Sequence, residues 1–82
     1  MDNKILVMVY VPILNQEYDC FIPIGGTIGM IKKTIIDTIG KFNEIEILKQ
    51  VKVFDKDSSI LYDDNKLVKD VNMKNGTKLL LI

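Results

Sequence analysis

One stretch, residues 27–40 (TIGMIKKTIIDTIG), constrains the fold more than any other because it has the pattern of an amphipathic helix. Thr27 is a good N-cap, and Gly40 supplies the left-handed conformation that ends many helices. Isoleucine is only a moderate helix former, so this helix should depend on packing, at about 1.5–3 kcal/mol for each buried isoleucine. At about 100° per residue, the isoleucines form one narrow stripe that a sheet must cover: Ile28, Ile31, Ile35 and Ile39, with Ile36 at the edge.

Length and composition indicate one folded domain. The chain has 82 residues, which suffices for a single domain, residues 1–82, around a single core. Hydrophobic residues make up 48% and charged residues 27%, as in a globular protein. The 11 basic residues are all lysines and balance 11 acidic ones, so neither net charge nor arginine chemistry favours nucleic acid as a partner.

The cellular location is inferred from cysteine usage and from the N-terminal apolar run. Cys20 is the only cysteine and cannot form an internal disulfide, which favours the cytoplasm. Residues 5–14 are apolar but too short to span a bilayer, and Pro12 together with the lack of a small-residue cleavage site argues against a signal peptide. We therefore expect no membrane insertion.

A hairpin is predicted before the helix. Residues 4–12 (KILVMVYVP) and 18–23 (YDCFIP) have strand composition, and the reversal is placed at residues 14–17. Side chains alternate between the two faces of a strand. Asp19 and Phe21 are expected on the outer face, and the inward side chains are expected to be Val7, Val9, Val11, Tyr18, Cys20 and Ile22.

Further strands are predicted after the helix. Residues 50–54 (QVKVF) alternate as a third strand with Val51 and Val53 inward, residues 60–62 form a short strand, and Asn75-Gly76 turns the chain into a last strand at residues 78–82. Turns are expected at residues 55–59 and 63–65, and an irregular segment is expected to be pinned to the core through Leu67, Val71 and Met73. Residues 45–48 either continue a helical turn or fill the bottom of the core; both alternatives stay open.

The order of elements defines the expected fold. A hairpin, one helix and further strands, joined with the right-handed crossover rule, predict a mixed sheet of four to five strands with one main helix on one face. This is an α+β fold of the ubiquitin-like β-grasp type.

The sequence also resembles a known family. The segments YVPILNQEYDCFIPIGGTIGMIKKTI and DDNKLVKDVNMKNGTKLLLI are similar to the bacterial YukD/EsaB group of ubiquitin-like proteins. The specific marks are Val-Pro at the end of the first strand, Tyr-Asp-x-x-Ile-Pro in the second, and Lys-Asn-Gly-Thr-x-Leu before the last. The resemblance implies a small cytoplasmic accessory component encoded with the type VII secretion machines of Gram-positive bacteria. A related domain is fused to membrane proteins of those machines.

No residue pattern indicates catalysis or a metal or cofactor site. The chain has no histidine, and Cys20 is expected to be a small buried hydrophobe rather than a nucleophile. Asp55-Lys-Asp57 begins like a calcium loop. However, Ile60 stands where that loop needs glycine and Lys66 where it needs glutamate. We therefore expect no enzyme activity, cofactor or metal.

Other polar segments are given structural interpretations. Residues 25–29 (GGTIG) lack the lysine and hydroxyl residue of a phosphate loop, so a tight entry to the helix is favoured over an anion site. Asp63 and Asp64 are expected to be solvated in a turn. Lys32 and Lys33 are expected to be solvated on the edge of the helix.

The outer face of the sheet is the candidate site for binding a protein. If the last strand lies between the first and third, an apolar patch forms there, and such patches commonly mark interaction sites. A register slipped by one residue, which would turn every side chain to the other face, is the alternative. By resemblance to ubiquitin-like proteins, Phe54 and Leu80 occupy the recognition patch. The candidate residues are Leu6, Met8, Tyr10, Phe54, Leu80 and Ile82.

The functional expectation is a non-catalytic, ubiquitin-like interaction module of a type VII secretion system. Its partner would be a protein, either a membrane component of that system or a second copy of the chain. One alternative is a homodimeric structural module that uses the same patch. A less favoured alternative is a sulfur-carrier-like protein, which requires a C-terminal Gly-Gly; here the sequence reads Leu-Leu-Leu-Ile, so we expect no conjugation chemistry.

Overall fold

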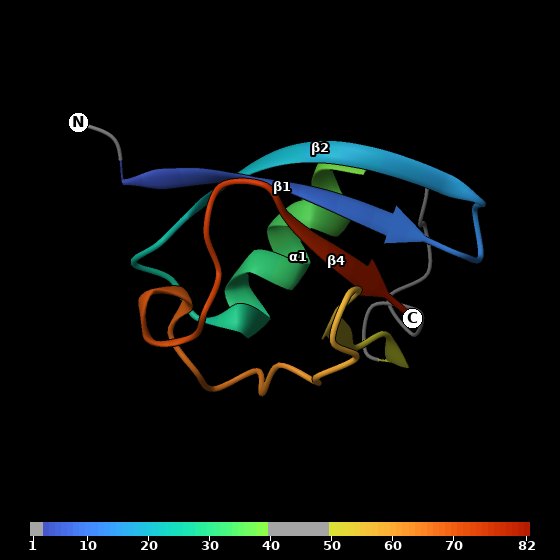
Figure 1. The fold of residues 1–82 in the computed structure, drawn as a ribbon. Coiled ribbons are helices and arrows are strands. Elements are labelled where there is room, and N and C mark those ends of the chain that lie inside the picture. The colour runs from blue at the N-terminus through green and yellow to red at the C-terminus, as the bar shows by residue number, and fades with distance from the viewer. Residues whose placement is uncertain (1–2, 40–49) are drawn as a thin grey trace.

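The computed structural model describes residues 3–39 and 50–82. In order β2-β1-β4-β3, the strands form one sheet in which β1 runs parallel to β4 and the other neighbours are antiparallel. The helix α1 lies against one face of this sheet (Figure 1), which confirms, for the described residues, the predicted mixed sheet with a main helix on one face. In chain order the elements are β1 (Lys4–Val11), β2 (Gln16–Pro23), α1 (Ile28–Ile39), β3 (Val53–Asp55), the 3₁₀ helix η1 (Val68–Asp70) and β4 (Thr77–Leu81).

The helix is capped and buried as its sequence predicts. The Thr27 hydroxyl oxygen accepts a hydrogen bond from the Met30 amide at 3.2 Å, which satisfies one of the free amides of the first turn. Ile39 is half-buried and packs against the core. The predicted end at Gly40 lies outside the described residues. The buried residues of α1 are Ile28, Ile31, Ile35 and Ile36.

The sheet meets the helix with the predicted faces. Val7, Val9 and Val11 of β1 have no exposed surface, so the alternative register slipped by one residue is wrong. In β2, Cys20 and Ile22 are buried as expected, whereas Tyr18 is half-buried at the margin of the core. The remaining strands add fully or almost fully buried residues to the same layer: Val53, Leu79 and Leu81.

The hairpin turn lies earlier than predicted. The turn comprises residues 12–15, and β2 begins at Gln16 rather than at residue 18, so the predicted reversal at residues 14–17 was wrong by two positions. Asn15 has a φ of 52°, a left-handed conformation that asparagine tolerates better than most residues. The amides of Leu14 and Asn15 bond back to the carbonyls of residues 11 and 12, and this tight turn lets the strands pair up to its edge.

The third strand is shorter than predicted, and the strand at residues 60–62 does not form. Over the described residues the sheet therefore has four strands, because the return segment makes only an isolated bridge between Leu61 and Phe54. Val51 is buried as predicted, but residues 51 and 52 lie before β3, which is limited to three residues. The left-handed Ser59 (φ 63°) ends the turn, after which Tyr62 is buried in the core. Residues 45–48 lie outside the described residues.

The segment after residue 66 is pinned to the core differently from the prediction. Val68, at the start of η1, is fully buried, whereas Leu67 and Val71 are only half-buried; Met73 is buried as expected. The Val68 amide donates to the Gly26 carbonyl at 2.9 Å. The spacing of the neighbouring apolar residues did not predict that Val68 is buried. The 3₁₀ turn of η1 rotates its side chain towards the core.

The isoleucine stripe should carry a large share of the stability. Ile35 is 1% exposed, so Ile35→Ala should lower the free energy of unfolding by about 2–5 kcal/mol through lost burial and an added cavity. Met30, on the same helix, is 62% exposed, so Met30→Ala should change the free energy of unfolding by less than about 0.5 kcal/mol. Urea unfolding of both variants measures the difference, and equal losses would contradict the assigned burial.

Candidate protein-interaction face

The outer face is the surface of the sheet opposite α1. On β1 the buried residues are the odd-numbered ones from residue 7 to residue 11, so the intervening side chains point away from the helix. Tyr10 pairs with Leu80 of β4, and Leu80 pairs with Phe54 of β3. Three large apolar side chains therefore lie side by side across three strands. All six predicted residues lie on this face: Leu6, Met8, Tyr10, Phe54 and Leu80 are half-buried, and Ile82 is exposed.

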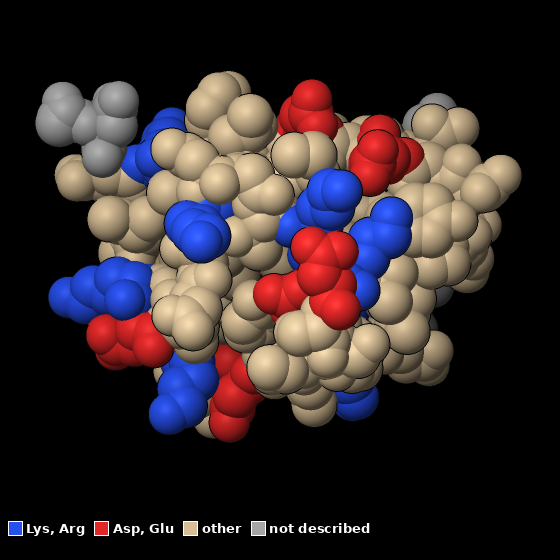
Figure 2. All heavy atoms as spheres, in the orientation of Figure 1, with Lys and Arg blue, Asp and Glu red and all other residues tan. Residues whose placement is uncertain are grey.

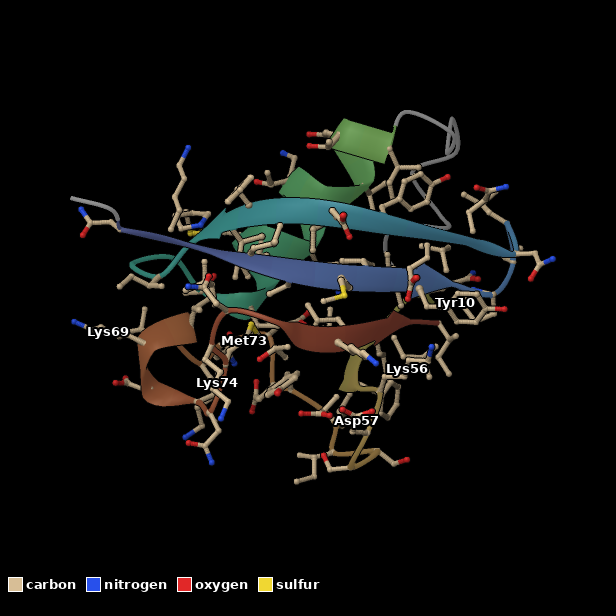
Figure 3. The ribbon with its side chains drawn as sticks, turned by 45° about the horizontal axis from the view of Figure 1, so that its top comes forward. Tyr10, Lys56, Asp57, Lys69, Met73 and Lys74 are labelled. Carbon is tan, nitrogen blue, oxygen red and sulfur yellow. The ribbon has the colours of Figure 1, made fainter. Side chains whose placement is uncertain are left out.

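Two further side chains shape this face. Phe21 is 68% exposed and pairs with Leu6, so it extends the apolar patch to β2. The alternation along β2 correctly predicted that Phe21 points outward. Phe21 was not included in the predicted patch because the acidic Asp19 lies on the same face of this strand. The ammonium group of Lys56 lies 4.9 Å from the centre of the Tyr10 ring (Figure 3) and forms a cation–π contact across β4. Sequence alone did not indicate this contact because Lys56 lies in the turn after β3.

Charged side chains border the apolar row on both sides. Glu17 and Asp19 are exposed on β2, at one edge of the sheet, where they pair with Tyr10 and Met8. In Figure 2, acidic side chains lie over β2 and also over β4, where they are directly beside lysines. Asp57 lies in the turn beyond β3. The exposed lysines on the side of β3 and β4 are Lys52, Lys56 and Lys78.

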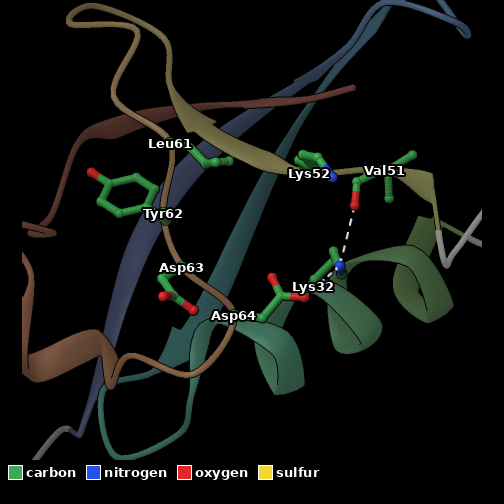
Figure 4. Close-up of a pocket in the computed structure, with 7 residues that line it drawn as sticks. All are labelled: Lys32, Val51, Lys52, Leu61, Tyr62, Asp63 and Asp64. Carbon is green, nitrogen blue, oxygen red and sulfur yellow. Dashed lines mark hydrogen bonds and ion pairs between the residues drawn. The ribbon is translucent and has the colours of Figure 1, made fainter.

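A groove of about 500 Å³ lies between α1 and the loop that precedes η1. Lys32 donates to the Val51 carbonyl at 3.1 Å and to the Asp64 carboxylate at 3.0 Å (Figure 4). It therefore joins the helix both to the segment just before β3 and to the loop before η1. The side chain of Lys32 is 13% exposed, which corrects the expectation that it is solvated; Lys33 is exposed as predicted. The Lys32 ammonium therefore already has two protein partners, and we assign this groove a structural role.

The glycine-rich helix entry also has a structural role. The amide of Ile28 donates to the Lys66 carbonyl at 2.9 Å, and the amide of Gly29 donates to the Asp64 carbonyl at 3.0 Å. The Asp64 carbonyl lies 3.3 Å from the position that a Cβ on Gly29 would take, so the loop packs closely on this turn. These two amides of the first helical turn thus bind the loop rather than an anion, in agreement with the predicted tight entry.

The remaining ionisable groups are tied to the fold. Burial, followed by the charge of Asp19, raises the pKa of the Cys20 thiol, which disfavours the reactive thiolate. Burial alone would raise the pKa of Asp55, but hydrogen bonds from the amides of Ser58 and Asp57 and from the Tyr62 hydroxyl lower it overall. The Asp55 carboxylate therefore organises the predicted turn at residues 55–59. Within residues 3–39 and 50–82, no group of three or more acidic or cysteine side chains has the arrangement of a metal site.

Comparison with known proteins identifies the fold. Neither a protein-family model nor a curated protein matches the sequence. The ubiquitin-like domain of an Arabidopsis thaliana protein superposes with a TM-score of 0.77 at 16% identity, covering 99% of this chain and 78% of that one. A structure described as molecular mimicry of SUMO gives a TM-score of 0.78 at 12% identity, covering 100% and 94%. The chain therefore has a ubiquitin-like β-grasp fold.

A longer protein contains a similar fold. ATBAG1, solved in complex with HSP70, superposes with a TM-score of 0.71 at 19% identity, over 95% of this chain and 39% of that one. Within the described part of the present chain, no helix is both long enough and apolar enough to cross a bilayer.

The contact between Tyr62 and Asp55 should appear in the alkaline stability of the protein. Burial and the Asp55 carboxylate raise the pKa of Tyr62 from its ordinary value of 10 to about 12. The folded state keeps the phenol neutral, so the stabilisation is complete below pH 10 and is lost as the pH rises towards 12. In Tyr62→Phe, the free energy of unfolding should fall less steeply across this range, as measured by urea unfolding at successive pH values.

Tyr18→Phe is the matched control, because Tyr18 is half-buried but lies on β2, away from Asp55. This variant should keep the steep slope of the unmodified chain. Equal slopes for the unmodified chain and Tyr62→Phe would show that Tyr62 does not carry the effect.

Proposed function

We propose that the chain is a non-catalytic, cytoplasmic interaction module that binds a protein through the outer face of its sheet. The single observation that carries this proposal is the row formed by Tyr10, Leu80 and Phe54 on the face that α1 leaves uncovered. Large aromatic side chains that lose contact with water on binding contribute much of the binding energy at protein interfaces. The partially exposed apolar neighbours on β1 and the exposed Phe21 enlarge the same surface.

The chemistry of the other clusters supports binding rather than catalysis. The Cys20 thiol is buried with a raised pKa, and Lys32 is held by Asp64 and by a backbone carbonyl. A nucleophile beside an activating base is the usual signature of covalent catalysis, and neither group has that setting. The apolar side chains of the outer face, in contrast, have no role in packing against α1, so folding alone does not explain them.

We further propose that the partner belongs to a type VII secretion system. The support is the resemblance of residues 10–35 and 63–82 to the YukD/EsaB group, whose members are encoded with such systems. The ubiquitin-like fold is compatible with this role, and a protein with a similar fold, ATBAG1, was solved in complex with HSP70. A membrane component of the secretion machine is the partner that the resemblance favours.

Substitutions on the outer face should abolish capture of the partner. Tagged chain should retain a secretion-system protein from cells of the source organism, whereas Phe54→Asp and Leu80→Glu should each retain less than about a tenth of it. An acidic side chain in a desolvated apolar interface costs several kcal/mol, which exceeds what a tenfold loss requires. Quantitative mass spectrometry of the captured proteins measures the result.

Met30→Asp is the matched control, since it adds the same charge to an exposed methionine on the helix, away from the outer face. All variants should keep their circular dichroism spectra and melt cooperatively. Folded Phe54→Asp and Leu80→Glu chains that capture the partner as well as the Met30→Asp chain would refute the assignment of the face. Capture that contains no secretion component would refute the proposed pathway alone.

A further inference from the structure

We propose that Asn75-Gly76 is a site of spontaneous deamidation, which the contact of this dipeptide with β1 keeps closed in the folded chain. When that contact opens, the main-chain nitrogen of Gly76 attacks the side-chain amide of Asn75 and converts the asparagine to aspartate or isoaspartate. The site lies in the turn before β4, and its chemistry does not depend on the proposed function of the outer face.

The sequence supplies the reactive pair at this position alone. Asn75 is the only asparagine of the chain that glycine follows. A glycine nitrogen can approach the preceding side-chain amide closely because no Cβ stands in the way, whereas a side chain at that position hinders the approach. Asn75 and Gly76 are both exposed, so water and hydroxide reach them in the folded chain. Conformation, rather than access of solvent, therefore decides whether the pair reacts.

Local hydrogen bonds fix the turn that holds this pair. The Thr77 amide donates to the Lys74 carbonyl at 3.0 Å, and φ is positive at Gly76 (90°) but not at Asn75, as in a type II turn. The Thr77 hydroxyl oxygen also accepts a hydrogen bond from the Lys74 amide at 2.9 Å. Met73, just before the turn, is buried in the core. The turn is therefore anchored on both sides of the reactive pair.

A single residue of β1 binds both reacting groups. The Leu6 amide donates to Oδ1 of Asn75 at 2.8 Å, and the Gly76 amide donates to the Leu6 carbonyl at 2.8 Å. These contacts stand at the start of the β1–β4 pairing, where the segment before β4 reaches β1 (Figure 1). While the N–H of Gly76 donates to Leu6, its nitrogen keeps its proton and points away from Cγ of Asn75. Both groups become free to react only when the turn separates from Leu6.

The reaction balances with water as its co-reactant. The Gly76 nitrogen loses its proton to a base from solvent and bonds to Cγ of Asn75, while the bond from Cγ to Nδ2 breaks and ammonia leaves with a proton returned by solvent. The product is a succinimide ring. Water then opens the ring at either carbonyl. One opening restores the original peptide bond and gives aspartate, and the other leaves the main chain running through Cγ and gives isoaspartate.

The two products differ in how they fit the fold. Aspartate keeps a side-chain oxygen that can accept the hydrogen bond from the Leu6 amide. Isoaspartate adds one atom to the main chain of the turn and attaches its carboxylate directly to Cα, so the two contacts with Leu6 and the type II turn cannot all form together. We therefore expect an isoaspartate chain to lose the start of the β1–β4 pairing and to be less stable than the unmodified chain.

Deamidation of the full chain in buffer and in concentrated urea tests the proposal. At the same mildly alkaline pH, Asn75 should convert at least about tenfold more slowly in buffer, because tenfold protection requires only a small free energy of opening. Peptide mass spectrometry follows the conversion. Gly76→Ala in urea is the chemical control, since the added methyl group should slow the attack. Hydrogen exchange of the Leu6 and Gly76 amides measures the open fraction, which should equal the ratio of the two rates.

A pair of matched variants separates the local contact from the rest of the fold. Thr77→Val removes the hydroxyl that binds the Lys74 amide, and it should raise hydrogen exchange at Gly76 and the rate of deamidation by the same factor. Thr34→Val removes a hydroxyl that binds the Met30 carbonyl on α1, and it should change neither. Equal deamidation rates in buffer and in urea, or a rate in buffer above the one that the open fraction allows, overturn the proposal.

The products test the second part of the proposal. After removal of urea, the purified isoaspartate chain should unfold at a lower urea concentration than the unmodified chain. Asn75→Asp is the matched control, because it carries the same charge on an unaltered main chain, and it should unfold close to the unmodified chain. An isoaspartate chain as stable as Asn75→Asp overturns the inference that this product is incompatible with the β1–β4 pairing.

Discussion

The parallel pairing of β1 with β4 is the contact on which the rest of the structure depends. It joins Val7 to Thr77 and Tyr10 to Leu80, near opposite ends of the sequence, and places the two strands at the centre of the sheet. Both strands contribute buried side chains to the core cluster that contains the helix stripe. Contacts between residues so distant in sequence require much of the chain to be ordered at once.

The same pairing creates the candidate interaction face. Residues that alternate with the buried valines and leucines are carried to the side that α1 does not cover. Their identity is not dictated by the core, yet they include the row of Tyr10, Leu80 and Phe54. A face with an apolar centre bordered by charged side chains has the composition expected of an interface with an apolar core and a polar rim.

Much of the fold follows from local patterns. The isoleucine spacing and the Thr27 cap predict α1 correctly, and the alternation along β1 predicts which valines are buried. Short-range rules failed where the backbone departs from regular geometry. The left-handed Asn15 moved the start of β2, and the 3₁₀ turn at η1 buried Val68 in place of its neighbours. In both places the hydrogen bonds of a turn, rather than the spacing of the apolar residues, determine which side chains are buried or where a strand begins.

The sequence by itself determined the main elements, their faces and the six apolar residues of the outer face, because side-chain periodicity in a helix or strand is a local property. Only the tertiary structure decided which side chains meet. The Lys32 contact with Asp64, the position of Lys56 over Tyr10 and the inclusion of Phe21 in the patch each join separate segments of the chain. Such contacts depend on strand register and loop path, which are set by the packing of the whole domain and leave no periodic signal in the sequence.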